Sequence, residues 1–298
     1  MALRPRLGRP PHAGAPSSGR GQVRRLQRRR PIRRGDPGAS VRSPACRESM
    51  RFGVCAGPDE AEAILAAGFD YVEMGLSSTA GNPDFDLTRL DGIPIAAMNL
   101  FFPSSVRLYG PDATEWREYA KRAIDRAAQV GVPVLVVGSG GARRAPDAPG
   151  DWEGAFVDVA AELQAIAASY GITIAPESLT RAETNIGNDL GTLALALAAR
   201  GVGFTADSFH ILQEQPDLEK IADEIPLLPR HVHLGSKGSR EVPQASEPGF
   251  ARFVAQLREL GYDGTASLEC KRGSTVDELR ENLISLRESF SHSPRKQE

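Results

Sequence analysis

Short runs of β-branched and apolar residues alternate with longer amphipathic stretches from Met50 almost to the end of the chain. Eight of the short runs are predicted to be strands, namely Arg51–Cys55, Asp70–Met74, Ile93–Asn99, Pro133–Gly138, Ile172–Glu177, Gly203–Asp207, His231–Leu234 and Thr265–Glu269. Because parallel neighbours need long crossover connections, strands that alternate with helices predict a parallel sheet.

The stretches between these strands place apolar residues on one helical face. The clearest case is the set Trp116, Tyr119, Ala120, Ala123, Ile124 and Ala127, and the same period recurs in 156–167 and 276–290. Glycines stand where helices should end before a strand, at Gly68, Gly131, Gly171, Gly201 and Gly261. The connection after the second strand is short and irregular, so its helix is expected to be reduced or absent.

Eight strand–helix units favour closure into a barrel over an open doubly wound sheet. No Gly-rich dinucleotide-binding turn follows the first strand. We therefore predict an α/β protein with a single (β/α)8 TIM barrel over residues 50–291. A disordered Arg-rich segment (1–49) is expected before the barrel and a disordered tail (292–298) after it.

Charge divides the chain unevenly. The first 49 residues hold thirteen Arg and only Asp36 and Glu48 as acids, so the remainder carries −13 against −2 for the whole chain. The basic segment has three interpretations: an over-extended reading frame with Met50 as the true start, an arm for nucleic acid or an acidic partner, or an organelle transit peptide. The acidic body argues against nucleic-acid binding by the barrel.

No apolar run approaches the ~20 residues that cross a bilayer, so no membrane association is expected. Three widely spaced cysteines suit free thiols better than a disulfide framework. Both observations favour a cytoplasmic protein.

The last four predicted strands each end in a side chain of metal-binding type, namely Glu177, Asp207, His233 and Glu269, which follow one another at intervals of 26 to 36 residues. In (β/α)8 barrels the active site lies at these strand ends. Each residue alone is more often a helix cap, a rim charge or a hydrogen-bonded strand residue. Together, three carboxylates and one imidazole favour Mn²⁺, Mg²⁺ or Co²⁺ over Zn²⁺, and a cation would relieve the repulsion among the acids.

Four segments resemble the xylose isomerase-like barrel family of sugar isomerases and epimerases, which includes ketose 3-epimerases, hydroxypyruvate isomerases and inosose dehydratases. The segments are Glu177-Ser-Leu-Thr-Arg-Ala-Glu-Thr-Asn185, Asp207-Ser-Phe-His210, His231-Val-His233 and Tyr262-Asp-Gly-Thr-Ala-Ser-Leu-Glu269. Their order and spacing match the family, and the resemblance runs from about Arg51 to Phe290.

The resemblance implies a division of roles. The metal ligands would be Glu177, Asp207, His233 and Glu269, and the catalytic pair that exchanges the substrate proton would be Glu177 and Glu269. Substrate oxygens would be contacted by Glu183, His210 and Arg240. Apart from the resemblance, the place of Glu73 at the end of the second strand suits either contact with substrate or completion of the polar network of the rim. Thr180 stands where many relatives have Asn, and Ser236 stands where epimerases often have Glu. These departures argue against the narrow assignment as a ketose 3-epimerase.

These residues predict a metal-dependent isomerase or epimerase of a small sugar, sugar acid or sugar phosphate. It would act by removing a proton next to a carbonyl, through a metal-stabilised enediolate. A small carbohydrate is the expected partner, and homodimerisation is left open. The alternatives are an inosose-type dehydratase on the same site and a non-catalytic barrel. A DNA-repair endonuclease would need more histidines and a basic groove.

Two further segments have alternative interpretations. The glycines of 138–144 (Gly-Ser-Gly-Gly-Ala-Arg-Arg) would either present backbone N–H groups to a phosphate or carboxylate or form a flexible loop with solvated arginines. The segment 101–103 (Phe-Phe-Pro) would form an apolar wall over the substrate or be buried under a loop.

Overall fold

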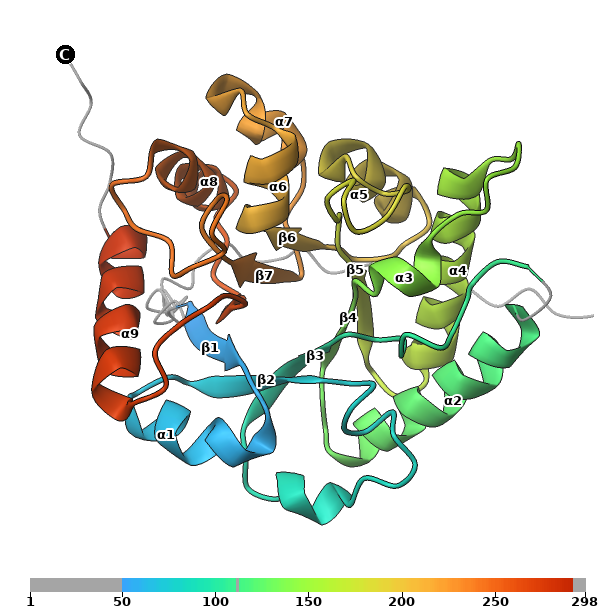
Figure 1. The fold of residues 1–298 in the computed structure, drawn as a ribbon, viewed down its shortest axis with the longest axis horizontal. Helices are drawn as coiled ribbons and strands as arrows, with labels where there is room; N and C mark the ends of the chain where they lie inside the picture. The colour runs from blue at the N-terminus through green and yellow to red at the C-terminus, as the bar shows by residue number, and fades with distance from the viewer. Residues whose placement is uncertain (1–49, 111–112, 292–298) are drawn as a thin grey trace, which may run out of the picture. The chain divides into compact units, whose positions relative to one another are not determined.

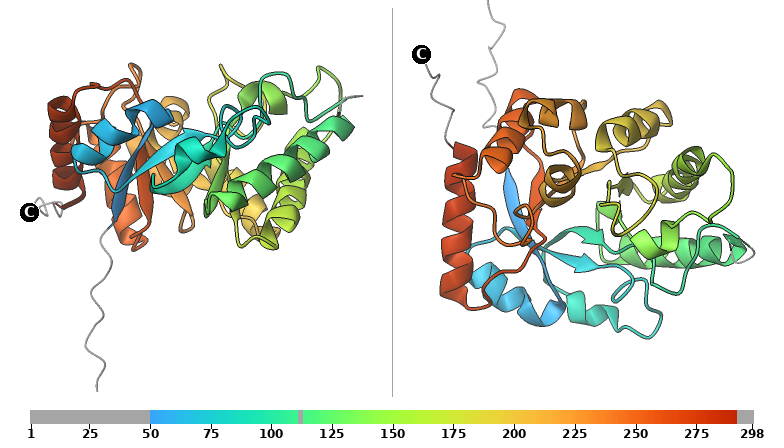
Figure 2. Two further views of the ribbon diagram at one scale, coloured as in Figure 1. Left: turned by 90° about the horizontal axis from the view of Figure 1, so that it is seen from below. Right: turned by 45° about the horizontal axis from the view of Figure 1, so that its top comes forward.

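The computed structural model describes residues 50–110 and 113–291, so the predictions for 1–49 and 292–298 concern residues outside these ranges. Eight strands run through the centre of the barrel and helices surround them (Figure 1; Figure 2). The strands are β1 (Arg51–Cys55), β2 (Tyr71–Gly75), β3 (Ile95–Asn99), β4 (Val134–Val137), β5 (Thr173–Pro176), β6 (Thr205–Asp207), β7 (His231–Leu234) and β8 (Thr265–Leu268). Each lies within the predicted run or one residue beyond it.

Every strand pair is parallel, in the order β5-β4-β3-β2-β1-β8-β7-β6. The ring is completed between its two ends by an isolated bridge between Glu177 and Thr205. The Thr205 hydroxyl adds a hydrogen bond to the Ala175 carbonyl at 3.0 Å. The predicted (β/α)8 barrel is therefore confirmed, as a nearly closed one.

The outer layer consists of α1 (Ala61–Ala66), α2 (Ala113–Gln129), α3 (Gly140–Arg143), α4 (Trp152–Ala168), α5 (Leu190–Ala199), α6 (Ser208–Glu214), α7 (Ile221–Glu224), α8 (Pro248–Glu259) and α9 (Val276–Ser291), with 3-10 turns at Pro58–Glu60, Leu87–Leu90 and Leu218–Lys220. The predicted apolar face of α2 is buried from Trp116 to Ala127. Between β2 and β3 the connection holds only the turn Leu87–Leu90, as expected. Among the described residues, no helix has the length and apolar character that a bilayer crossing requires.

Glycine is required where the backbone or a neighbour leaves no room for a side chain. The helix-ending Gly131 and Gly171 adopt φ of 73° and 71°, a conformation that other residues rarely adopt. In β1, a Cβ on Gly53 would lie 2.2 Å from the ring of Tyr71. Gly53 therefore lets the Tyr71 ring turn into the barrel, where its hydroxyl meets the Ser267 hydroxyl at 2.9 Å.

Candidate active site

The four side chains predicted as metal ligands meet at the carboxyl ends of β5 to β8. The Nδ1 atom of His233 lies 3.1 Å from a Glu177 oxygen and 3.5 Å from a Glu269 oxygen. It lies 4.0 Å from Asp207 Oδ2. One ligand atom each from the set Glu177, Asp207, His210 and Glu269 lies within 4.8 Å of the others. The structure therefore brings together a carboxylate and histidine cluster that can hold a metal ion.

Asp207 shows most directly that the cluster fits a cation. Its Oδ1 accepts hydrogen bonds from the Phe209 and His210 amides at 2.7 and 3.4 Å and so caps α6. Its Oδ2 is buried and accepts no hydrogen bond from any described residue. Because a buried carboxylate oxygen without a hydrogen bond is costly, and because hard divalent cations prefer oxygen ligands, this donor set fits a divalent ion.

The two glutamates predicted to exchange a proton differ in acidity. Burial opposes ionisation of Glu177, but the hydrogen bond and charge of His233 lower the pKa of Glu177 below its usual value. Burial raises the pKa of Glu269 to about 7; His233 opposes this rise, and the charges of Glu177 and Asp207 add to it. Neighbouring carboxyl groups with divergent pKa values are the pattern expected of an acid and base pair.

The three residues expected to contact substrate oxygens surround this cluster. His210 is buried, with Nε2 3.4 Å from Asp207 Oδ2 and Nδ1 3.2 Å from Glu183 Oε2. The Arg240 guanidinium lies 2.5 Å from Glu269 Oε2 and 3.7 Å from Glu183 Oε1. Arg240 adopts φ 52°, an uncommon conformation for a non-glycine residue. All three line the same cavity as the glutamates.

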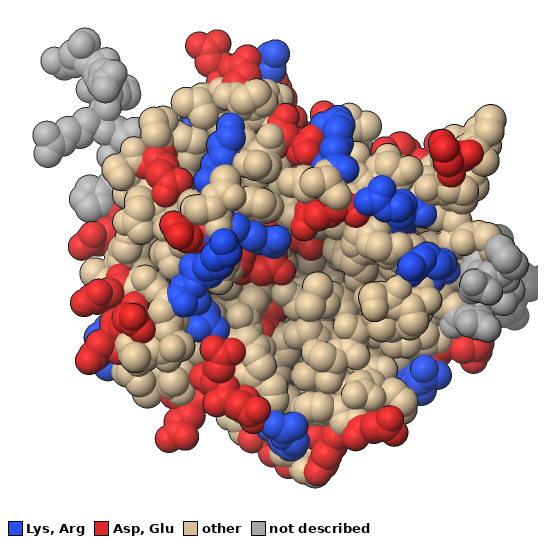
Figure 3. Space-filling view, viewed as in Figure 1, with Lys and Arg blue, Asp and Glu red and all other residues tan. Residues whose placement is uncertain are grey.

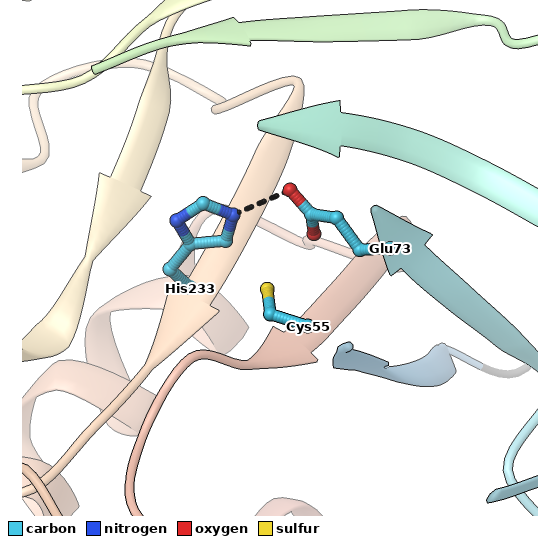
Figure 4. Close-up of side chains that lie close together, drawn as sticks. All are labelled: Cys55, Glu73 and His233. Atoms are coloured by element: carbon cyan, nitrogen blue, oxygen red, sulfur yellow. Dashed lines mark hydrogen bonds and ion pairs between the residues drawn. The ribbon is translucent and has the colours of Figure 1, made fainter. Parts of the chain in front are cut away.

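Glu73 lies below that cavity and is fully buried. Its two oxygens accept from His231 Nε2 at 2.7 Å and from His233 Nε2 at 2.9 Å. Figure 4 shows Glu73 facing His233, with Cys55 beside them. Burial raises the pKa of the Cys55 thiol well above its usual value, so Cys55 is a poor ligand although it lies within 4.8 Å of both. This group is a hydrogen-bonded layer beneath the candidate metal site.

Sequence reasoning missed three residues that shape the site. Asn99 donates to Glu269 Oε1 at 2.9 Å, and its place at the end of a predicted strand was a usable signal. His231 lies two residues before His233 on one strand, a spacing that puts both side chains on one face. Arg143 is fully buried and donates to the Glu177 carbonyl oxygen at 2.7 Å. Nothing in the sequence distinguishes it from the exposed Arg144.

The structure shows where the side chains of both open segments lie. In 138–144, Arg143 is buried and not solvated. Gly138 makes room for the Glu177 carboxylate, because a Cβ there would lie 2.1 Å from Glu177 Oε1. Phe101 and Phe102 are buried against each other and against Tyr119. The ring centroid of Phe102 lies 4.7 Å from that of Phe101 and 5.9 Å from that of Tyr119. The burial alternative therefore holds for this pair.

A cavity of about 630 Å³ opens at the cluster, and a neighbouring one of about 540 Å³ shares Cys55, Leu100 and Glu269 with it. Figure 3 shows acidic side chains at the bottom of the central hollow and basic ones beside it, on the side of β7 and β8. Arg240 and Lys271 are the basic residues that line the 630 Å³ cavity. A larger hollow of about 740 Å³ lies between α4 and α5. Its acids cap these helices, pair with Arg200 or, in the case of Glu153, accept from the Gly187 amide, so we place the chemistry at the strand ends.

The family model described as xylose isomerase-like TIM barrel matches residues 61–289. The chain belongs to this family. A curated relative, 3-dehydroshikimate dehydratase of Pseudomonas aeruginosa, is 28% identical over 272 residues, which cover 80% of this chain and 41% of the relative. The chain thus spans about two-fifths of the length of that relative.

Solved structures of similar fold are sugar epimerases and a fusion protein. A D-psicose 3-epimerase solved in the presence of D-fructose is 18% identical, with a TM-score of 0.68 over 82% of this chain and 100% of that one. The 3-keto-D-glucoside 4-epimerase of E. coli is 20% identical, with a TM-score of 0.64 over 80% of this chain and 99% of that one. A fusion of a xylose isomerase-like barrel with a 4-hydroxyphenylpyruvate dioxygenase is 24% identical, with a TM-score of 0.61 over 83% of this chain and 45% of that one. These likenesses support the fold of this family member.

Proposed function

We propose that this barrel is a divalent-metal-dependent enzyme that removes a proton next to a carbonyl in a small polyhydroxylated substrate and so isomerises or epimerises it. The observation that carries the proposal is the convergence of three carboxylates on His233 Nδ1, at 3.1 to 4.0 Å, where Asp207 Oδ2 accepts no hydrogen bond from any described residue. Such a cluster is costly without a cation and productive with one.

The metal would be held by the predicted set, Glu177, Asp207, His233 and Glu269. When bound, the ion would supply Lewis acidity that stabilises negative charge developing on the carbonyl oxygen. Mn²⁺, Mg²⁺ and Co²⁺ suit these ligands best, and Mn²⁺ is our first choice.

The residues of the chain then divide the proton transfers. Glu177, whose pKa is lowered, is the carboxylate that accepts the carbon-bound proton. Glu269, with a pKa of about 7, can hold a proton at neutral pH and return it from another side of the site. Arg240 orients Glu269, while His210 and Glu183 are available to hydroxyl groups of the substrate. Glu73, with both oxygens occupied, is better suited to supporting His233 than to touching substrate.

The test is solvent exchange at carbon. Chelator-stripped protein is loaded with one metal at a time and incubated in D₂O with ketoses, hydroxypyruvate, inososes and 3-dehydroshikimate. We expect metal-dependent deuterium incorporation next to a carbonyl, detected by NMR, and its loss in Glu177→Gln and Glu269→Gln. The surface variant Glu118→Gln, whose parent residue pairs with Lys121, is the matched control. Protein that binds none of the metals, or exchange that survives in both active-site variants, would refute the proposal.

Elimination of water is the second candidate, because the curated relative is a dehydratase. In that reaction a base takes the proton next to the carbonyl, the bond from the β-carbon to its hydroxyl breaks, and the hydroxyl leaves as water with a proton from an acid. His210 and Glu269 are the candidate acids in the cavity. A product lighter by one water selects this reaction over isomerisation. A cytoplasmic location and homodimerisation stay predictions.

A further inference from the structure

Three buried side chains form a continuous layer directly beneath the candidate metal site. Glu73 comes from β2, and His231 and His233 come from β7 across the barrel; each is fully buried. Glu73 Oε2 lies 2.7 Å from His231 Nε2, and Glu73 Oε1 lies 2.9 Å from His233 Nε2. One carboxylate thus bridges two imidazoles, and neither the fold nor the proton transfers described above require that arrangement.

The bridge determines where each imidazole carries its proton. A carboxylate only accepts hydrogen bonds, so both histidines must donate through Nε2–H. The other nitrogen of His231, Nδ1, lies 2.8 Å from the Thr265 hydroxyl, which can donate to it. His231 is therefore held in one orientation from both sides, and it in turn occupies the second oxygen of Glu73.

The same logic fixes the nitrogen of His233 that faces the cavity. With Nε2–H directed at Glu73, Nδ1 is the nitrogen that faces Glu177 Oε2, 3.1 Å away, where it can donate a proton when it carries one. Once Nδ1 has lost that proton, its lone pair and the carboxylate oxygen repel each other unless a cation lies between or beside them. The layer therefore directs the nitrogen that a metal would bind toward the carboxylates.

We propose that Glu73, itself held by His231, is a positioning residue that fixes the tautomer and orientation of His233 and strengthens metal binding through it. The proposal rests on the proposed function, because it takes His233 as a metal ligand. A carboxylate behind a ligating imidazole makes the imidazole a better donor and stops the ring from turning, and loss of such a partner typically weakens metal affinity by about 10- to 100-fold.

The decisive variant is Glu73→Gln, which keeps the size of the side chain. Glutamine offers one acceptor oxygen and one NH₂ group, so it can accept from only one of the two histidines. The other histidine must move its proton or turn its ring. We expect the Kd for Mn²⁺, measured by calorimetric titration of the full chain, to rise by about 10- to 100-fold while the variant stays folded.

Tyr71→Phe is the matched control. It removes the 2.9 Å hydrogen bond to Ser267 in the same buried part of the barrel and leaves both acceptor oxygens of Glu73 in place. The Ser267 hydroxyl stays 3.4 Å from His231 Nε2, farther than the 2.7 Å that separates Nε2 from Glu73. We expect its Kd for Mn²⁺ to stay within about twofold of the wild-type value. An equal loss of affinity in both variants would mean that general damage to the interior, not the Glu73 bridge, is measured, and would overturn the proposal.

Nitrogen-15 NMR of the histidines gives a readout that a merely structural role would not move, and it needs only the wild-type protein. In the Mg²⁺ form we expect two slowly exchanging Nε2–H signals, from His231 and His233, and in Glu73→Gln the loss of one. A wild-type His233 protonated on Nδ1 alone overturns the proposal. A Glu73→Gln variant that binds Mn²⁺ as tightly as the wild type also overturns the positioning role of Glu73. That result would not affect the proposed function. Wild-type protein that binds no divalent ion refutes both.

Discussion

Asp207 offers the sharpest test of the site, because its two oxygens have separate tasks. Oδ1 caps α6 and Oδ2 is buried with no hydrogen-bond donor among the described residues. In Asp207→Asn the amide oxygen can keep the cap, since asparagine is as good an N-cap as aspartate, while the NH₂ group replaces Oδ2 in the cluster. The substitution therefore separates metal binding from helix capping.

The expected magnitude follows from mass action. A ligand at 100 times its Kd stabilises the folded state by about 2.7 kcal/mol. For a domain of this size, 1 kcal/mol corresponds to about 2–4 °C in Tm, so Mn²⁺ should raise the wild-type Tm by about 5–11 °C. In Asp207→Asn this rise should nearly vanish. Without metal, the Tm of the variant should equal or exceed that of the wild type, because one of three adjacent negative charges is gone.

The assay is thermal unfolding of chelator-stripped protein over a series of Mn²⁺ concentrations. Asp189→Asn is the matched control, because Asp189 caps α5 by accepting from the Thr192 amide at 2.7 Å and lies away from the cluster. It should keep the full metal response. The reasoning is refuted if Asp207→Asn keeps that response, or if it lowers the Tm of the metal-free protein by as much as the metal raises the wild-type Tm.

Three further outcomes are expected. Burial opposes protonation of His233, but the charges of Glu73 and Glu269 raise the pKa of His233 well above its usual value in the metal-free protein. The stability that this proton contributes is therefore complete below pH ~6.5 and is lost as pH rises through the raised pKa. Because Mn²⁺ must displace that proton, calorimetry should show that the affinity for Mn²⁺ increases with pH. Gly138→Ala should lower turnover at least tenfold without unfolding the protein, because its Cβ would lie 2.1 Å from the Glu177 carboxylate, and unchanged turnover would contradict that geometry. Tyr119→Phe removes a buried 2.7 Å hydrogen bond to the Phe101 carbonyl and should lower the stability by about 1–2 kcal/mol in denaturant titration, with the metal response unchanged.

The barrel and the convergence of the candidate ligands were predictable because both follow from rules of chain geometry. A residue that ends a parallel strand must lie at one rim of the barrel, so Glu177, Asp207 and Glu269 could be placed together from their positions alone. The buried faces of the helices followed from their period in the same way. Both inferences need only local spacing, which the sequence contains.

Depth within the barrel was not predictable. Glu73 and Glu269 occupy similar places near strand ends, yet one is buried under the site with both oxygens bonded and the other lines the cavity. Arg143 and Arg144 are neighbours in sequence, and only the first is buried. These differences depend on which side chain from another strand or loop faces the residue, a long-range property that no local pattern contains.

The incomplete pairing of β5 with β6 has a consequence for how occupancy of the site can be observed. The two strands share one isolated bridge and one side-chain hydrogen bond, so this seam is the least firmly joined part of the ring. Glu177 and Asp207 stand on its two sides. An ion bound by both carboxylates would link β5 to β6 across this seam. Backbone amides of 173–177 and 205–207 should therefore exchange more slowly with solvent when the metal is bound.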